Sequence, residues 1–207
     1  MSTTDNLEKE IKFIVTAATS EATLAAAAAW PGAAVSAPTY ELTSMYDTEE
    51  GRMNDEDARL RLRQIGVGEA ATLEFCYKRR LPAMGFVKQE EEIETAFAGV
   101  SDVAKFALIL GRMGYAPTTS YERLRTTVLV DDVKLTVDEF PFGYLLEIEG
   151  EEGAVLDATA RLGFDAATST LESCDDIYER LCRECGLTPS SHIRFDDETM
   201  PQYEAGV

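Results

Sequence analysis

The sequence predicts an α+β fold in which antiparallel strands carry charged side chains along one face and helices connect some of the strands. Charged and apolar residues alternate with a period of two in several segments, as expected for strands whose two faces meet different surroundings. Other segments place apolar residues at helical spacing and end in glycine. We therefore expect strands at residues 7–15, 39–46, 58–65, 71–78, 89–97, 121–130, 133–140 and 144–149. We expect helices at residues 20–29, 103–113, 151–161 and 174–185.

Short polar turns separate the elements in the first half of the chain. Ser20 is the expected N-cap of the first helix, and Pro31-Gly32 is its expected stop. Residues 47–57 are polar and contain Gly51, so we expect a turn region after the second strand. Residues 66–68 form the expected hairpin turn before the strand at 71–78.

The second half of the chain predicts three consecutive strands followed by two helices. Turns are expected at residues 131–132 and 141–143, between these strands. Gly114, Gly163 and Gly186 mark the ends of the three predicted helices in this half. From Thr188 onward the sequence predicts a loose tail. We interpret residues 1–187 as a single domain and residues 188–207 as a C-terminal tail.

The composition is that of an ordinary globular protein. The 207 residues are 45% hydrophobic and 28% charged, which suits one medium-sized domain. No apolar run is long enough to cross a bilayer, and residues 1–7 lack the basic and apolar parts of a secretory signal. We therefore expect a cytoplasmic protein without a membrane partner. The net charge of −19 disfavours nucleic acid as a partner, and both a monomer and a homodimer stay open.

The cysteines and the histidine exclude some chemistry. Cys182 and Cys185 form a CxxC pair, but their spacing from Cys174 and His192 matches no dependable zinc motif. We interpret all four cysteines, including Cys76, as free thiols of a reducing compartment. Because His192 is the only histidine, mechanisms that need two histidines are excluded.

The charged residues form stripes of like charge along the predicted strands. Arg59, Arg61 and Arg63 share one strand face, with leucines on the other face. Arg123 and Arg125 form a second basic pair. Acidic pairs are Glu8 with Glu10, Glu92 with Glu94, and Glu147 with Glu149. A single such stripe would be an ordinary solvated sheet face. That interpretation weakens across the set, because each of these stripes holds charges of one sign only.

Neighbouring like charges cost free energy unless an opposite charge offsets them. A cavity that holds both an anion and a cation would offset the basic and the acidic stripes together. Pairs of glutamates supply the oxygen ligands that Mg²⁺ or Mn²⁺ prefers. Pairs of arginines supply forked donors that match phosphate oxygens. If the sheet closed on itself, the stripes would line a lumen.

The charged stripes belong to an ordered set of short motifs. These are Glu8-x-Glu10-x-Lys12, Tyr46-Asp47-Thr48, Leu60-Arg61-Leu62-Arg63, Tyr77-Lys78, Glu92-Ile93-Glu94, Arg123-x-Arg125, Val137-Asp138-Glu139 and Glu147-Ile148-Glu149-Gly150. The set resembles the CYTH superfamily, the triphosphate tunnel metalloenzymes. The first motif alone is weak, but the order and spacing agree from Glu8 to Gly150. One position departs from the pattern, because Glu90 stands where relatives often carry arginine.

The resemblance implies an eight-stranded antiparallel closed barrel, or tunnel, with peripheral helices. It implies that a triphosphate is bound by Lys12, Arg61, Arg63, Lys78, Arg123 and Arg125. It implies that Mg²⁺ or Mn²⁺ is bound by Glu8, Glu10, Glu94, Asp138, Glu147 and Glu149. The expected catalytic residues are Lys12, which could act as a base, together with Glu8 and Glu10.

Three functions stay open at this point. The favoured one is metal-dependent hydrolysis of a triphosphate, which could be inorganic tripolyphosphate, thiamine triphosphate or a nucleoside triphosphate. The second is the class IV adenylate cyclase reaction, which makes cyclic AMP and pyrophosphate from ATP. Bacterial cyclases of the family often carry a His-Phe pair before the first motif, and residues 1–7 contain neither residue, which favours hydrolysis. The third is a non-catalytic module that binds polyphosphate or a nucleotide.

Overall fold

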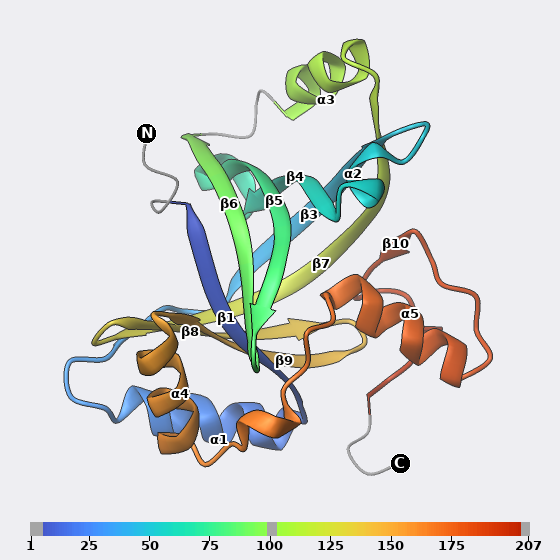
Figure 1. The fold of residues 1–207 in the computed structure, drawn as a ribbon. Helices are drawn as coiled ribbons and strands as arrows, with labels where there is room; N and C mark the ends of the chain where they lie inside the picture. Colours follow the sequence, from blue (N-terminus) through green and yellow to red (C-terminus); the bar gives the residue numbers. More distant parts are fainter. Residues whose placement is uncertain (1–5, 99–102, 204–207) are drawn as a thin grey trace.

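The structure, a computed structural model that describes residues 6–98 and 103–203, is built around eight long strands (Figure 1). These strands are β1 (Leu7–Val15), β3 (Thr39–Thr48), β4 (Ala58–Ile65), β5 (Thr72–Met84), β6 (Val87–Ala98), β7 (Tyr115–Val130), β8 (Val133–Phe140) and β9 (Gly143–Gly150). They pair in the order β7-β3-β4-β5-β6-β1-β9-β8, and β8 pairs back to β7. Every pair in this ring is antiparallel. The predicted closed eight-stranded barrel is therefore confirmed.

Two short strands extend the sheet outside the ring. β2 (Ala34–Val35) pairs with β7 in antiparallel fashion. β10 (His192–Ile193) pairs with β7 in parallel fashion. Because β7 has 16 residues, it is long enough to pair with several strands along its length.

Helices cover the outside of the barrel. They are α1 (Ala17–Ala28), α2 (Arg52–Asp55), α3 (Val103–Arg112), α4 (Glu152–Arg161) and α5 (Cys174–Glu184). In Figure 1, α1 and α4 lie together below β8 and β9, and α3 lies at the opposite end, near the top of the view. None of the helices in the described ranges is both long and apolar enough to span a membrane.

The apolar core lies between the barrel wall and these helices. Ile11, Leu135 and Ile148 point outward from their strands and pack with Val155 of α4 in one buried cluster. On the other side of the barrel, Leu62 and its neighbours pack with Leu110 of α3. Since successive strand residues alternate between faces, placing the apolar faces outward sends the charged faces into the barrel.

Helix α5 packs across one end of the barrel. Its buried residues Ile177, Tyr178 and Leu181 form a cluster with Phe140 and Phe142. The helix begins with a capping box, in which the Ser173 hydroxyl accepts from the amide of Asp176 and the Asp176 carboxylate accepts from the amide of Ser173. The cap fixes where the helix begins, and thus which residues of its first turn face the barrel.

Several boundaries differ from the sequence prediction: β5 runs on to Met84, for example, and β7 already begins at Tyr115. In the first half of the chain, side-chain caps explain two of the differences. Helix α1 begins at Ala17, since Thr16 is the N-cap and its hydroxyl accepts from the amide of Thr19 at 3.1 Å. Ser20, the predicted cap, lies inside the first turn and donates its hydroxyl to the carbonyl of Ala17. The predicted turn at 47–57 contains α2, because the Asp47 carboxylate accepts from two amides at the start of that helix.

The predicted loose tail is ordered over residues 188–203. Ile193 is only 3% exposed and pairs with Tyr121 of β7. The amide of Tyr203 donates to the carbonyl of Phe142 at 3.0 Å. A two-residue strand has too few residues to show a periodic pattern, and its burial depends on β7, so no local pattern predicts it. Residues 204–207 of the predicted tail lie outside the described residues.

The buried position of Ile193 leads to a stability prediction. We expect Ile193→Ala to lower the free energy of unfolding by about 2–4 kcal/mol, since a core methyl cluster is removed and a cavity is left. Leu187→Ala is the control, because Leu187 is 41% exposed, and we expect it to cost less than about 0.5 kcal/mol. Urea unfolding of both variants measures the difference. Equal, small effects would show that the tail is not part of the folded domain.

Candidate active site

The barrel encloses a cavity of about 260 Å³ that is lined mostly by charged residues. The described residues that line it include ten carboxylates and nine cations. The cations are Lys12, Arg59, Arg61, Arg63, Lys78, Lys88, Arg123, Arg125 and Lys134. All six cations predicted to bind substrate are in this set. Closing the ring therefore brings residues from all eight of its strands into one site.

Opposite charges meet across neighbouring strands. In the antiparallel register Lys12 faces Glu147, Arg125 faces Asp138, and Lys78 faces Glu92. Residues that face each other in such pairs lie on the same side of the sheet and close together. These pairs offset part of the cost of placing charge inside the barrel. Like charges also face each other, as where Glu10 faces Glu149.

Asp138 holds the two arginines of β7. Its side chain is fully buried and accepts from Arg123 Nη1 at 2.8 Å and from Arg125 Nε at 2.6 Å. Arg123 Nε also donates to Glu41 at 2.7 Å. The pKa of Glu41 is lowered to about 2, because Arg123 and Arg63 outweigh the opposing effect of burial. The two arginines are therefore held in fixed directions by carboxylates on neighbouring strands.

The cations of β4 and β5 form a second group in the cavity. Arg63 Nε donates to the Thr43 hydroxyl at 3.2 Å, and Arg61 Nη2 donates to Glu92 at 3.1 Å. Lys78 lies 3.1 Å from the same Glu92 carboxylate. Arg61 Nε is buried and has no hydrogen-bond partner among the described residues. A buried donor without a partner is costly, and an anion in the cavity could accept from it.

Three of the predicted metal ligands come together. Oxygen atoms of Glu8, Glu10 and Glu149 lie within 4.8 Å of one another, which suits a divalent cation with oxygen ligands. The pKa of Glu8 is raised to about 8, because burial, together with the charges of Glu10 and Glu149, outweighs the opposing effect of Lys78. A divalent cation would relieve this crowding of negative charge, so the donor set fits Mg²⁺ or Mn²⁺.

Lys12 lies between the acidic cluster and the arginines. Its ammonium is 3.0 Å from Glu147 and 3.4 Å from Glu10. Burial by itself would lower the pKa of Lys12, but these two carboxylates outweigh burial and raise the pKa above its usual value. Burial also opposes ionisation of Glu10, yet Lys12 and Lys88 lower the pKa of Glu10 to about 2. The surroundings therefore favour Lys12 as a permanent cation over Lys12 as a base.

The other predicted metal ligands lie outside this cluster of three glutamates. The Glu147 carboxylate binds Lys12 and also accepts from Arg125 at 2.9 Å. The Asp138 carboxylate accepts hydrogen bonds from both arginines of β7. In this structure both residues hold cations of the binding site in place, and their role as metal ligands stays a prediction.

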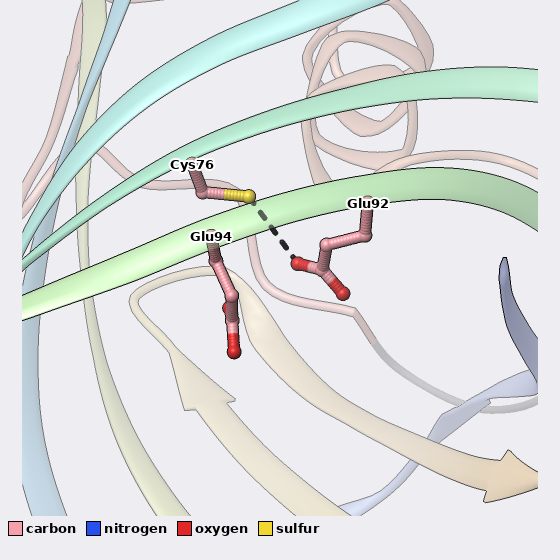
Figure 2. Close-up of side chains that lie close together, drawn as sticks. All are labelled: Cys76, Glu92 and Glu94. Atoms are coloured by element: carbon pink, nitrogen blue, oxygen red, sulfur yellow. Dashed lines mark hydrogen bonds between the residues drawn. The ribbon is translucent and has the colours of Figure 1, made fainter. Parts of the chain in front are cut away.

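Glu94 belongs to a separate group with Cys76 and Glu92 (Figure 2). The Cys76 thiol comes from β5 and is directed at the Glu92 carboxylate of β6, to which it donates at 3.3 Å. Burial raises the pKa of the Cys76 thiol to about 12, so the sulfur stays protonated and is a poor metal ligand. Glu94 is exposed, and it does not share the cluster of Glu8, Glu10 and Glu149.

Sequence reasoning missed several residues of the cavity. Lys88 is only 4% exposed and lies 3.0 Å from both Glu10 and Glu90. Lys88 lies on the same strand face as Glu90 and Glu92. It was missed because the strand was predicted to begin at residue 89. Arg59, which the motifs do not include, forms an ion pair with Glu90. Lys88 and Arg59 thus supply cations around the position where relatives often carry arginine.

The fold and the cavity define a class of protein: a closed antiparallel barrel with a charged lumen that combines a carboxylate cluster with many cations. The sequence matches the CYTH domain family over residues 6–173, and the chain belongs to this family. No curated protein matches the sequence.

Solved structures share the fold at low sequence identity. A candidate adenylate cyclase from Vibrio parahaemolyticus is 20% identical, with a TM-score of 0.65, over 83% of this chain and 97% of that one. The PH1012 protein of Pyrococcus horikoshii is 16% identical, with a TM-score of 0.64, over 80% of this chain and 96% of that one. A candidate adenylyl cyclase from Hippeastrum, described as having a dominant triphosphatase activity, is 15% identical, with a TM-score of 0.61, over 90% of this chain and 100% of that one.

The burial of Asp138 leads to a second stability prediction. We expect Asp138→Asn to lower the free energy of unfolding by about 3 kcal/mol, because two buried arginines lose their shared counter-charge. Asp157→Asn on the exposed face of α4 is the matched control and should have almost no effect. Thermal unfolding of the ligand-free proteins checks both. If Asp138→Asn leaves the free energy of unfolding unchanged, these arginines do not depend on the carboxylate.

Proposed function

We propose that this protein hydrolyses a triphosphate inside the barrel in a reaction that depends on Mg²⁺ or Mn²⁺. The observation that carries the proposal is one cavity containing both the carboxylate cluster of Glu8, Glu10 and Glu149 and a set of cations that could accept phosphate oxygens as partners. Membership of the CYTH family and the triphosphatase activity described for the Hippeastrum protein support the same reaction.

The charge balance of the cavity supports the metal requirement. The described lining residues carry ten carboxylates against nine cations, so the lumen is already close to neutral without substrate. A triphosphate brings several further negative charges into a space of low dielectric constant. Divalent cations that enter with the substrate would offset these charges, and the cluster of three glutamates supplies ligands for one of them.

The residues divide into three tasks in this reaction. Glu8, Glu10 and Glu149 would hold the divalent ion, which when bound supplies Lewis-acid polarisation of phosphate oxygens. Arg61, Arg63, Lys78, Arg123 and Arg125 would bind the phosphate oxygens and stabilise charge that develops during transfer. Lys12 would bridge these two groups as a fixed ammonium ion. Because the arginines are already oriented by carboxylates, little reorganisation is needed when the substrate enters.

Product analysis with a panel of substrates tests this proposal. We expect phosphate release from inorganic tripolyphosphate, ATP or thiamine triphosphate in the presence of Mg²⁺ or Mn²⁺, and none with a chelator. Glu149→Gln should raise the metal concentration needed for half-maximal rate at least tenfold, since one of three ligands loses its charge. Formation of cyclic AMP and pyrophosphate from ATP would instead assign a cyclase. Tight binding without turnover would assign a binding module.

The partly unpaired guanidinium of Arg61 gives a prediction on affinity. Arg61→Ala should raise the KM for tripolyphosphate by roughly tenfold or more, because a forked donor to phosphate is lost. Arg79→Ala is the matched control, since Arg79 lies on the outer face of β5, is exposed and pairs with Glu91. Its KM should stay within about twofold of the wild type. Equal KM changes in both variants would show that Arg61 contacts no substrate.

A further inference from the structure

The wall of the lumen contains a tyrosine, Tyr121, that none of the sequence motifs includes. It lies on the same face of β7 as Arg123 and Arg125, and like them it lines the cavity. The Tyr121 side chain is only 4% exposed, yet its hydroxyl has no hydrogen-bond partner among the residues that the structure describes. A buried tyrosine hydroxyl usually has such a partner, so this one can bind a molecule that enters the cavity.

The ring of Tyr121 is held by apolar packing that does not use the hydroxyl. Its centroid is 5.7 Å from the ring centroid of Phe140, and both rings belong to the cluster that packs under α5. Removing the hydroxyl would leave these ring contacts in place. The structural role of the ring can therefore be tested separately from any role of the hydroxyl.

The strand register places Tyr121 close to an arginine of β4. Tyr121 faces Thr43 of β3, and Thr43 faces Arg63 of β4. Tyr121 and Arg63 both line the lumen, whereas the shorter Thr43 side chain between them is fully buried and does not. The Thr43 hydroxyl already accepts from Arg63 Nε at 3.2 Å. The two longer side chains thus extend into the cavity on either side of one small residue.

The surroundings of the Tyr121 hydroxyl are positively charged. Burial raises the pKa of Tyr121 above its ordinary value, although Arg63, Arg123 and Arg61 act in the opposite direction. The hydroxyl therefore keeps its proton at neutral pH and can donate it in a hydrogen bond. Because three guanidinium ions lie nearby, an anion is a more favourable acceptor there than a neutral group.

Two of these arginines also have donors to spare. Arg61 Nε and Arg123 Nη2 are buried and make no hydrogen bond to the described residues. Arg123 Nη2 lies 2.6 Å from Glu41 Oε2, in an ion pair that lacks the geometry of a hydrogen bond. Leaving buried donors without acceptors costs free energy. A phosphate group, with several charged oxygens, could accept from these donors and from the tyrosine together.

This group of donors is separate from the glutamate cluster that could hold a divalent ion. Glu8 and Glu149 of that cluster also line a neighbouring hollow, together with Leu129 and Asp131. Tyr121 does not line this hollow, since it packs under α5. The tyrosine and the glutamates therefore occupy different parts of the lumen wall.

We propose that Tyr121 is a substrate-binding residue whose hydroxyl donates to an oxygen of the phosphate group farthest from the glutamate cluster. This inference rests on the proposed function and adds a neutral donor to the predicted cations. The three arginines near Tyr121 contact the same phosphate group. Since the hydroxyl carries no charge, it contributes affinity without adding to the charge of the lumen.

The test uses Tyr121→Phe, which removes the hydroxyl and keeps the ring. Calorimetry in Mg²⁺ with bis(methylene) triphosphate, a non-hydrolysable analogue of tripolyphosphate, measures the dissociation constant. We expect Tyr121→Phe to raise it roughly tenfold, because a hydrogen bond to a charged acceptor is lost. The KM for tripolyphosphate should rise similarly. The Mg²⁺ concentration needed for half-maximal rate should stay within about twofold, unlike that of Glu149→Gln.

Tyr40→Phe is the matched control. The Tyr40 hydroxyl donates to Glu122 at 2.9 Å, and Tyr40 does not line the lumen. We expect this variant to bind the analogue within about twofold of the wild type. Urea unfolding of both variants should show that Tyr121→Phe is as stable as the wild type.

The outcomes separate this inference from the proposed function. An unchanged dissociation constant in Tyr121→Phe, or an equal rise in Tyr40→Phe, would overturn the role of Tyr121 and leave the triphosphatase standing. A loss of stability that accounts for the loss of affinity would also overturn it. If the wild type binds the analogue but hydrolyses no triphosphate, only the proposed hydrolysis fails, and the dissociation constants still decide the role of Tyr121. A wild type that does not bind the analogue would overturn both.

Discussion

The pairing of opposite charges across neighbouring strands is the interaction on which this structure depends. A barrel that turns its charged faces inward must compensate each charge, because an uncompensated one would be excluded from such a space by its desolvation cost. The antiparallel register supplies the compensation, as where Lys12 faces Glu147 and Arg125 faces Asp138. Closing the ring joins these pairs into a continuous network around one cavity. The network allows the charged strand faces to point into the barrel, and it orients the cations that could bind an anion.

The inward orientation of the charged faces also decides where the apolar core forms. Because the lumen is polar, the apolar core forms on the outside of the barrel, between the strands and the covering helices. Ile11 and Ile148 pack beneath α4, and Leu62 packs with Leu110 of α3. The helices are therefore part of the core that keeps the ring closed. The C-terminal segment has a similar role, since Ile193 completes the cluster that holds α5 over one end of the cavity.

The site combines rigidly oriented arginines with polar groups that lack a hydrogen-bond partner or a counter-charge. Asp138 and Glu41 hold Arg123 in place, whereas Arg61 keeps one buried donor without a partner among the described residues. Glu8, Glu10 and Glu149 crowd negative charge at another part of the wall, which a divalent ion would relieve. The lumen as a whole is nearly neutral, so a substrate and its metal ions would enter together without a large change in total charge. This balance is compatible with a protein whose overall charge is −19.

The sequence by itself determined the α+β class, the positions of the eight long strands and which side chains share a strand face. These features follow from a period of two, which is local and needs no knowledge of partners. The motifs then identified six of the nine cations that line the cavity. What the tertiary structure alone decided is which charges meet, since register and ring closure bring together residues distant in the chain. This is why Lys88, the Arg59–Glu90 pair, the separation of Glu94 from the glutamate cluster and the docking of the tail could not be deduced from local pattern.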